Sequence, residues 1–361
     1  MKSFSILAAV VLGAALSACG GGDSAGKSGA SASAAPRASN SGVDLTGAGA
    51  TFPNPLYTKW FSDYATKTGV KINYQSIGSG GGIRQLTEGT VDFGASDAPM
   101  SDAEIAKLKG PVLHIPTVMG AVAITYNVPN VAQGLKLTGP VIADIFAGKI
   151  TKWNDSRIKT LNTTSTLPAS DIIVVHRSDG SGTTYIFSDY LAAVSPAWSK
   201  SPGKGKELQW PVGLGGKGNE GVAGQVKQTP GAIGYVELVY AKQNKLPYAA
   251  VQNAKNEFVI PSLESITAAA ASANFPPNTD YRVSIVNAPG AGAYPISSFT
   301  YLLVPQRIAD AAKGKKLVDF LRWALTEGEP TAAPLDFAPL PAALIADLTK
   351  RIDTIKLGSG S

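Results

Sequence analysis

The chain contains few of the residues from which enzymes build reactive centres, because its 361 residues include one cysteine and two histidines. A single cysteine excludes an internal disulfide. No histidine, cysteine and carboxylate residues are spaced as metal ligands, and neither a GxxxxGK[ST] segment nor a G-x-S-x-G elbow is present. His114 lies between apolar residues and is expected to be packed, and His176 to point away from its neighbour Arg177. These absences argue against nucleotide-dependent, metal-dependent and serine-hydrolase enzymes, and no cofactor or metal is expected.

Long apolar runs are also missing, and the apolar stretch 6–16 is too short to span a bilayer. Lys2 precedes it, and Leu-Ser-Ala-Cys at 16–19 matches a bacterial lipobox. The pattern predicts a lipoprotein signal peptide at 1–18 and lipidation of Cys19; an ordinary signal peptide with a chance cysteine is the alternative. Residues 19–42 are rich in Gly, Ser and Ala and are expected to form a flexible tether.

Charge of one sign does not accumulate anywhere in the chain. The formal net charge is +6, from 32 basic and 26 acidic residues that are dispersed along the sequence. Without a dense Lys/Arg stripe, nucleic acid is not an expected partner. The mild positive balance suits an anionic ligand, although it is equally compatible with an ordinary solvated surface.

Short strand patterns alternate with helix patterns after the tether. Strands are expected at 70–74, 91–95, 172–175, 233–236 and 299–304. Helices are expected around Trp60, from Ile83 to Gly89, over 185–191, from Asn219 as the cap to about Gln228, and over 314–325. This alternation predicts an α/β fold with helices on the faces of a sheet.

The most informative segment is 177–184, Arg-Ser-Asp-Gly-Ser-Gly-Thr-Thr, where an expected strand meets an expected helix. Free backbone N–H groups and the positive end of the helix dipole gather at such a junction. Arg177 adds a planar fork of donors, and Asp179 is placed to hold its guanidinium. The segment therefore predicts an oxyanion site, phosphate above all.

Three further segments share this chemistry: TGAGATF at 46–52, GSGGG at 78–82 and DFGASDAP at 92–99. Glycines let the backbone approach a ligand closely, and the hydroxyls of Thr51 and Ser79 can donate to oxygen. Asp97 stands out because a carboxylate repels an anion. It either caps the helix at 101–104, pairs with an arginine, or accepts the proton of monohydrogen phosphate. In the last case it rejects sulfate, which has no proton at neutral pH, because an unpaired buried charge is costly.

Taken together, the segments at 46–53, 78–82, 92–99, 177–183, 210–218 (WPVGLGGKG) and 230–236 (PGAIGYV) resemble the periplasmic phosphate-binding proteins of bacterial high-affinity phosphate ABC transporters. The resemblance runs from Leu45 to the C-terminal region. One departure is Gly80, where many relatives carry a second serine. The ligand positions that the resemblance implies are Thr51, Phe52 (through its backbone N–H), Ser79, Asp97, Arg177, Ser181, Gly182 and Thr183.

The resemblance also implies a two-lobed type II periplasmic binding protein fold with a hinge between the lobes. The chain then crosses between lobes near 121–126 and near 289–297. Lobe one comprises 43–123 plus 294–361, and lobe two comprises 124–293.

The function implied is to bind inorganic phosphate outside the cytoplasmic membrane, in the periplasm or at the outer face of the envelope. A monomer anchored through lipidated Cys19 then delivers it to the membrane permease of an ABC importer driven by a cytoplasmic ATPase. On this interpretation the protein is not an enzyme. The alternative is an extracytoplasmic phosphate-ester hydrolase, because phosphatases share anion-site chemistry.

Overall fold

The computed structural model describes residues 44–273 and 279–358. The expected signal peptide (1–18), the lipidation site Cys19 and the tether (19–42) lie outside the described residues. Among the residues that the structure describes, none of the helices combines the length and the apolar character that crossing a bilayer requires.

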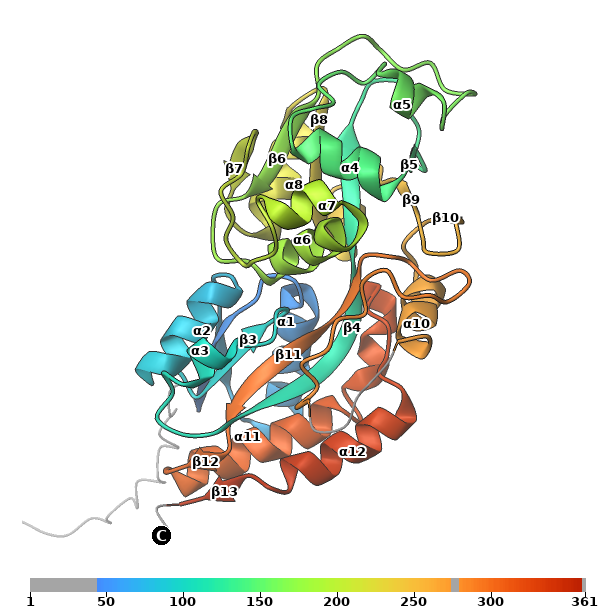
Figure 1. Cartoon of the computed structure of the whole chain (residues 1–361). Coiled ribbons are helices and arrows are strands. Elements are labelled where there is room, and N and C mark those ends of the chain that lie inside the picture. The colour runs from blue at the N-terminus through green and yellow to red at the C-terminus, as the bar shows by residue number, and fades with distance from the viewer. Residues whose placement is uncertain (1–43, 274–278, 359–361) are drawn as a thin grey trace, which may run out of the picture. The chain divides into compact units, whose positions relative to one another are not determined.

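The sequence alternates strands and helices as expected for an α/β protein (Figure 1). The strands of the described residues are β1 (Leu45–Gly49), β2 (Ile72–Ser76), β3 (Phe93–Ser96), β4 (Val112–Asn127), β5 (Lys136–Leu137), β6 (Ile173–Arg177), β7 (Leu214–Gly216), β8 (Ala232–Glu237), β9 (Ala250–Gln252), β10 (Phe258–Val259), β11 (Ser297–Pro305), β12 (Arg307–Ile308) and β13 (Lys356–Leu357). The α-helices of the same residues are α1 (Asn54–Thr68), α2 (Ser79–Glu88), α3 (Asp102–Ile105), α4 (Gly139–Phe146), α5 (Ser156–Lys159), α6 (Gly182–Val194), α7 (Pro196–Lys200), α8 (Gly218–Gln228), α9 (Leu238–Gln243), α10 (Leu263–Ala271), α11 (Ala311–Ala324) and α12 (Ala342–Ile352). Short 3-10 turns, η1 (Glu329–Thr331) and η2 (Ala333–Leu335), precede α12.

One long strand joins the two halves of the main sheet. Within the described residues this sheet has eight strands in the order β2-β1-β3-β11-β4-β8-β6-β7. β4 pairs antiparallel with β11 from Val112 to Ala121 and then with β8 from Val122 to Asn127. We call β2, β1, β3 and β11 the first half of the sheet, and β8, β6 and β7 the second half. β4 runs through both (Figure 1).

The expected elements are present, with shifted ends. Leu56, Trp60, Phe61 and Tyr64 form the buried face of α1, as their spacing predicts. The strand expected at 70–74 runs instead from Ile72 to Ser76. Sequence pattern therefore locates elements better than it locates their ends.

Most of the glycine segment at 78–82 belongs to the helix that it was expected to precede. α2 begins at Ser79, four residues before the expected start at Ile83. A Cβ on Gly82 would lie 2.5 Å from the backbone oxygen of Ala48. The glycine is therefore required because the first turn of α2 packs directly on the backbone of β1.

Candidate functional site

The candidate site lies where strands of both halves end. In the first half, Thr51 follows β1, Ser79 follows β2 and Asp97 follows β3. In the second half, segment 178–183 follows β6 and segment 217–219 follows β7. β1 is parallel to β2 and β3, and β6 is parallel to β7, so carboxyl ends gather at one edge in each half. Ligands of open α/β sheets bind at such edges.

Arg177 is the buried cation of the site. Its Nε donates to Asp179 Oδ1 over 2.7 Å and its Nη2 donates to Asp179 Oδ2 over 2.6 Å, a bidentate pair. Burial by itself raises the pKa of Asp179, but the hydrogen bonds and charge of Arg177 outweigh it and hold this pKa below its usual value. The remaining nitrogen, Nη1, donates to Thr183 Oγ1 over 3.3 Å. The guanidinium plane is thereby fixed, with one edge turned away from its carboxylate partner.

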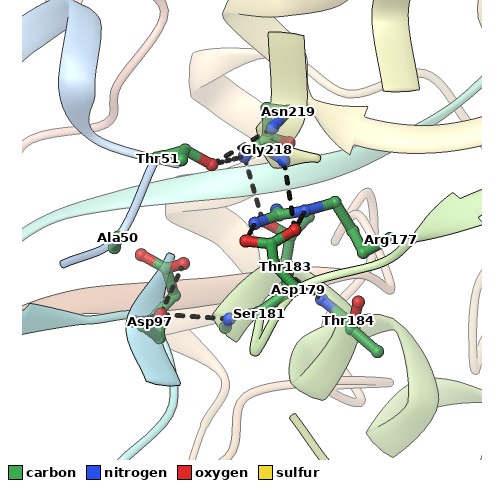
Figure 2. Close-up of polar contacts among 12 residues, drawn as sticks. Ala50, Thr51, Asp97, Arg177, Asp179, Ser181, Thr183, Thr184, Gly218 and Asn219 are labelled. Carbon is green, nitrogen blue, oxygen red and sulfur yellow. Dashed lines mark hydrogen bonds and ion pairs between the residues drawn. The ribbon is translucent and has the colours of Figure 1, made fainter. Parts of the chain in front are cut away.

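Asn219 links the two halves and was not expected in the site. Its Nδ2 donates to Thr51 Oγ1 over 2.8 Å and to Thr183 Oγ1 over 3.1 Å. Its backbone N–H also donates to Thr51 Oγ1, over 3.2 Å. Figure 2 shows Asn219 beside Gly218, between Thr51 and the segment that carries Thr183. The sequence suggested Asn219 as a helix cap; that was wrong, because the N-cap of α8 is Lys217 and Asn219 lies in the first turn.

Ser79 makes a second link between the halves. Its Oγ accepts the backbone N–H of Gly182, the first residue of α6, over 3.0 Å, and that of Asp97 over 3.3 Å. Beside it the N–H of Gly80 donates to the carbonyl of Gly180 over 2.8 Å. A Cβ on Gly182 would collide with Asp97 Oδ2 and would lie 2.5 Å from Ser79 Oγ. Only glycine allows this approach.

Asp97 is buried, with 1% of its surface exposed. Its Oδ1 accepts a hydrogen bond from Thr300 Oγ1 on β11 over 2.8 Å, and Ser79 Oγ is 3.5 Å from its Oδ2. Burial raises the pKa of Asp97 to about 7, and the Thr300 hydrogen bond, the charge of Arg177 and the Ser79 contact oppose the rise only in part. The helix-cap alternative for Asp97 is wrong, because Ser101 caps α3 through a capping box with Glu104.

The other expected ligand positions take different places. The hydroxyl of Ser181 is the N-cap of α6 and accepts the N–H of Thr184 over 3.0 Å. Phe52 follows Thr51 directly, and its buried ring packs against Phe337 with 6.2 Å between centroids. Thr300 and Asn219, which the sequence did not assign to the site, contact the expected set. The sequence around neither residue indicates a binding role, because Thr300 lies inside an ordinary strand and Asn219 resembles a helix cap.

The arrangement is rich in donors and includes the carboxylate of Asp97, for which the described residues provide no salt-bridge partner. Arg177, the hydroxyls and the first turns of α2 and α6 bring positive or donor groups together. Thr51, Ser79, Arg177 and Thr183 are each at most 3% exposed. Electrostatic and hydrogen-bonding interactions are stronger in such a water-poor site than at a surface. Chemically, the site can hold an oxyanion that offers several acceptor oxygens and one proton.

Comparison of the sequence with known proteins identifies the family to which it is similar. Residues 29–327 match the family model described as the PBP superfamily domain. The phosphate-binding protein PstS of Xylella fastidiosa (strain Temecula1) is 48% identical over 307 residues, which cover 85% of this chain and 84% of the relative. The protein of the same name from Methanocaldococcus jannaschii is 42% identical over 324 residues, covering 84% of this chain and 82% of the relative.

Comparison with solved structures identifies proteins that share the fold of this chain. The periplasmic phosphate-binding protein PfluDING, solved with phosphate, superposes with a TM-score of 0.68 at 21% identity, covering 88% of this chain and all (100%) of that one. A phosphate-binding protein from Stenotrophomonas maltophilia superposes with a TM-score of 0.64 at 20% identity, covering 85% and 93%.

Proposed function

The chain belongs to the PBP superfamily and has its two-lobed type II fold, and from this premise we propose that it binds inorganic phosphate and delivers it to an ABC phosphate importer. Relatives at up to 48% identity over most of the chain bear the name phosphate-binding protein PstS. The protein is a solute-binding protein of phosphate transport. No contact among the described residues favours the phosphate-ester hydrolase that the sequence left open.

The observation that carries the proposal is the buried group of donors around Arg177 with a single carboxylate opposite. We propose that Thr51, Phe52 (through its N–H), Ser79, Asp97, Arg177, Ser181, Gly182 and Thr183 contact the phosphate, with Asp179 holding Arg177. A dissociation constant of 1 μM requires about 8 kcal/mol. Several hydrogen bonds to charged groups at about 1.5–3 kcal/mol each supply this after the cost of ordering.

The selectivity that we propose rests on Asp97. A carboxylate can accept a hydrogen bond from the proton of monohydrogen phosphate, but it has nothing to accept from sulfate. Because Asp97 is 1% exposed, water cannot replace the missing partner. Sulfate is thus excluded by a charge left unpaired and not by its size.

We further propose that lobe one comprises 43–123 plus 294–361 and that lobe two comprises 124–293. The change of partner along β4, from β11 at Ala121 to β8 at Val122, supports a boundary there. The hydrogen bonds from Asn219 to Thr51 and from Gly182 to Ser79 then join the lobes over the ligand. A monomer with hinged lobes can expose and enclose the site.

For location, we propose that the signal peptide at 1–18 is removed and that lipidated Cys19 anchors the protein through the tether 19–42 at the outer face of the cell envelope. The lipobox at 16–19 supports this. The permease in the membrane and its cytoplasmic ATPase are the partners that the proposal implies.

The test is calorimetric titration of the purified full-length protein with phosphate and with sulfate at pH 8. We expect one phosphate site at about micromolar affinity or tighter and, at the same concentrations, no heat from sulfate. Equal binding of the two anions would overturn the role of Asp97, and no phosphate binding would overturn the function itself. A chromogenic phosphate monoester should not be turned over.

A further inference from the structure

Asn219 uses its whole side chain, and its orientation is fixed by the backbone. Its Oδ1 accepts the N–H of Glu237, at the end of β8, over 2.8 Å. Because a backbone N–H can only donate, the oxygen must face Glu237 and the NH₂ group must face the two threonines. Asn219 is fully buried (0% exposed), so water does not compete for these bonds.

The hydroxyl of Thr51 has no acceptor capacity left. A hydroxyl has one proton and two lone pairs. Thr51 Oγ1 accepts from both the backbone N–H and the Nδ2 of Asn219, over 3.2 and 2.8 Å. Both lone pairs are therefore occupied, and the proton of Thr51 must point to another acceptor.

The hydroxyl of Thr183 also has no acceptor capacity left. Its Oγ1 accepts from Arg177 Nη1 over 3.3 Å and from Asn219 Nδ2 over 3.1 Å. Neither donor can act as an acceptor. One amide group, that of Asn219, thus completes the set of accepted bonds on two hydroxyls that come from opposite halves of the sheet.

We propose that Asn219 is a positioning residue that turns the hydroxyl protons of Thr51 and Thr183 toward the ligand and so makes both threonines obligatory donors. The inference rests on the proposed phosphate function, because it names what sets the direction of two of its ligands. Preset donors cost no reorganisation when an anion binds, which is the advantage of a preorganised site. Asn219 acts through the threonines and need not touch phosphate.

The decisive experiment is a double-mutant cycle of Asn219→Asp and Thr183→Val, read by phosphate titration calorimetry at pH 8 on the full-length protein. A carboxylate at 219 keeps the bond to the N–H of Glu237 but accepts where the amide donated. It should therefore draw the hydroxyl protons of both Thr51 and Thr183 away from the ligand. We expect Asn219→Asp to bind phosphate about 100-fold more weakly, as two lost hydrogen bonds predict.

The cycle separates hydrogen-bond direction from the added charge. Thr183→Val should weaken binding about tenfold in the parent and less than about twofold in the Asn219→Asp background, where the hydroxyl no longer serves phosphate. Charge repulsion alone would leave the two losses equal, and equal losses would overturn the proposal.

Two further variants guard against trivial results. Asn162 is a buried amide (7% exposed) that bridges the backbone of Lys136 and Ile158, and Asn162→Asp should leave phosphate affinity unchanged. If Asn219→Asp does not fold, Asn219→Ala replaces it: it frees both hydroxyls and should bind about tenfold more weakly. Parent-like affinity of Asn219→Ala would refute the inference, whereas a parent protein that binds no phosphate would refute the proposed function instead.

Discussion

Burial raises the pKa of Asp97 and the hydrogen bond from Thr300 opposes this rise, so removal of the Thr300 hydroxyl gives a sharp prediction. The Thr300 hydroxyl donates to Asp97 Oδ1 over 2.8 Å, and both residues are buried. A hydrogen bond to a charged group contributes about 1.5–3 kcal/mol, and one pKa unit corresponds to about 1.36 kcal/mol. The isosteric change Thr300→Val should therefore raise the pKa of Asp97 by about 1–2 units from its value of about 7.

Sulfate is the right probe because it carries no proton near neutral pH, so its binding reports only the protein. A protonated Asp97 can donate to sulfate, whereas an ionised one cannot. At pH 8 about a tenth of the parent protein has Asp97 protonated, against half or more of Thr300→Val. We expect the variant to bind sulfate about five- to tenfold more tightly than the parent at pH 8, and its sulfate–pH profile to lie 1–2 units higher.

The controls bracket this result. Thr117 is a buried threonine whose hydroxyl donates to the carbonyl of Thr300 without touching Asp97, so Thr117→Val should leave the sulfate profile unchanged. Asp97→Asn, which offers an NH₂ at every pH, should bind sulfate with no pH dependence from this group. If Thr300→Val and the parent share one sulfate profile in calorimetry from pH 5 to 9, ionisation of Asp97 does not set selectivity.

Four further outcomes are expected. Arg177→Ala should lose at least about 100-fold in phosphate affinity by calorimetry, because it removes the buried cation. Gly182→Ala should bind phosphate about tenfold more weakly or worse, because its Cβ strikes Ser79 and Asp97, whereas Gly224→Ala, with open space at its Cβ, should match the parent. In the ligand-free protein the raised pKa of Asp97 stabilises the fold below about pH 4, and this contribution is lost as pH rises to about 7. The free energy of unfolding of Asp97→Asn, measured in urea, should therefore rise relative to that of the parent between these pH values, by on the order of 4 kcal/mol at most. Cys19→Ser should leave the membrane fraction on centrifugation; its retention there would refute lipid anchoring.

Sequence reasoning succeeded where chemistry is local. The strand–helix junction at 177–184 was visible because arginine, glycines and hydroxyls adjoin in the chain, and α6 begins there at Gly182. The sequence predicts that the glycines at 78–82 precede a helix at Ile83, whereas α2 already begins at Ser79. Their actual constraint, contact between Gly82 and the backbone of β1, is tertiary and leaves no local trace.

It failed where a role depends on distant partners. Asn219 has the composition of a helix cap, and its bonds to Thr51 and Thr183 span 168 and 36 residues. Thr300 is one residue of an ordinary buried strand, and Asp97, which it contacts, lies 203 residues away. Pairings of this kind are set by sheet order, which periodicity does not determine.

The burial of the site has a consequence for the rate at which a ligand leaves. Thr51, Ser79, Asp97 and Arg177 are each at most 3% exposed, so the groups that we propose to hold the anion are enclosed by protein. Exchange must wait until contacts such as Gly80 N–H to Gly180 C=O separate. Residence time is then governed by the frequency of opening, and an anion that forms fewer hydrogen bonds to the two halves should leave faster, because those bonds must break before the site opens.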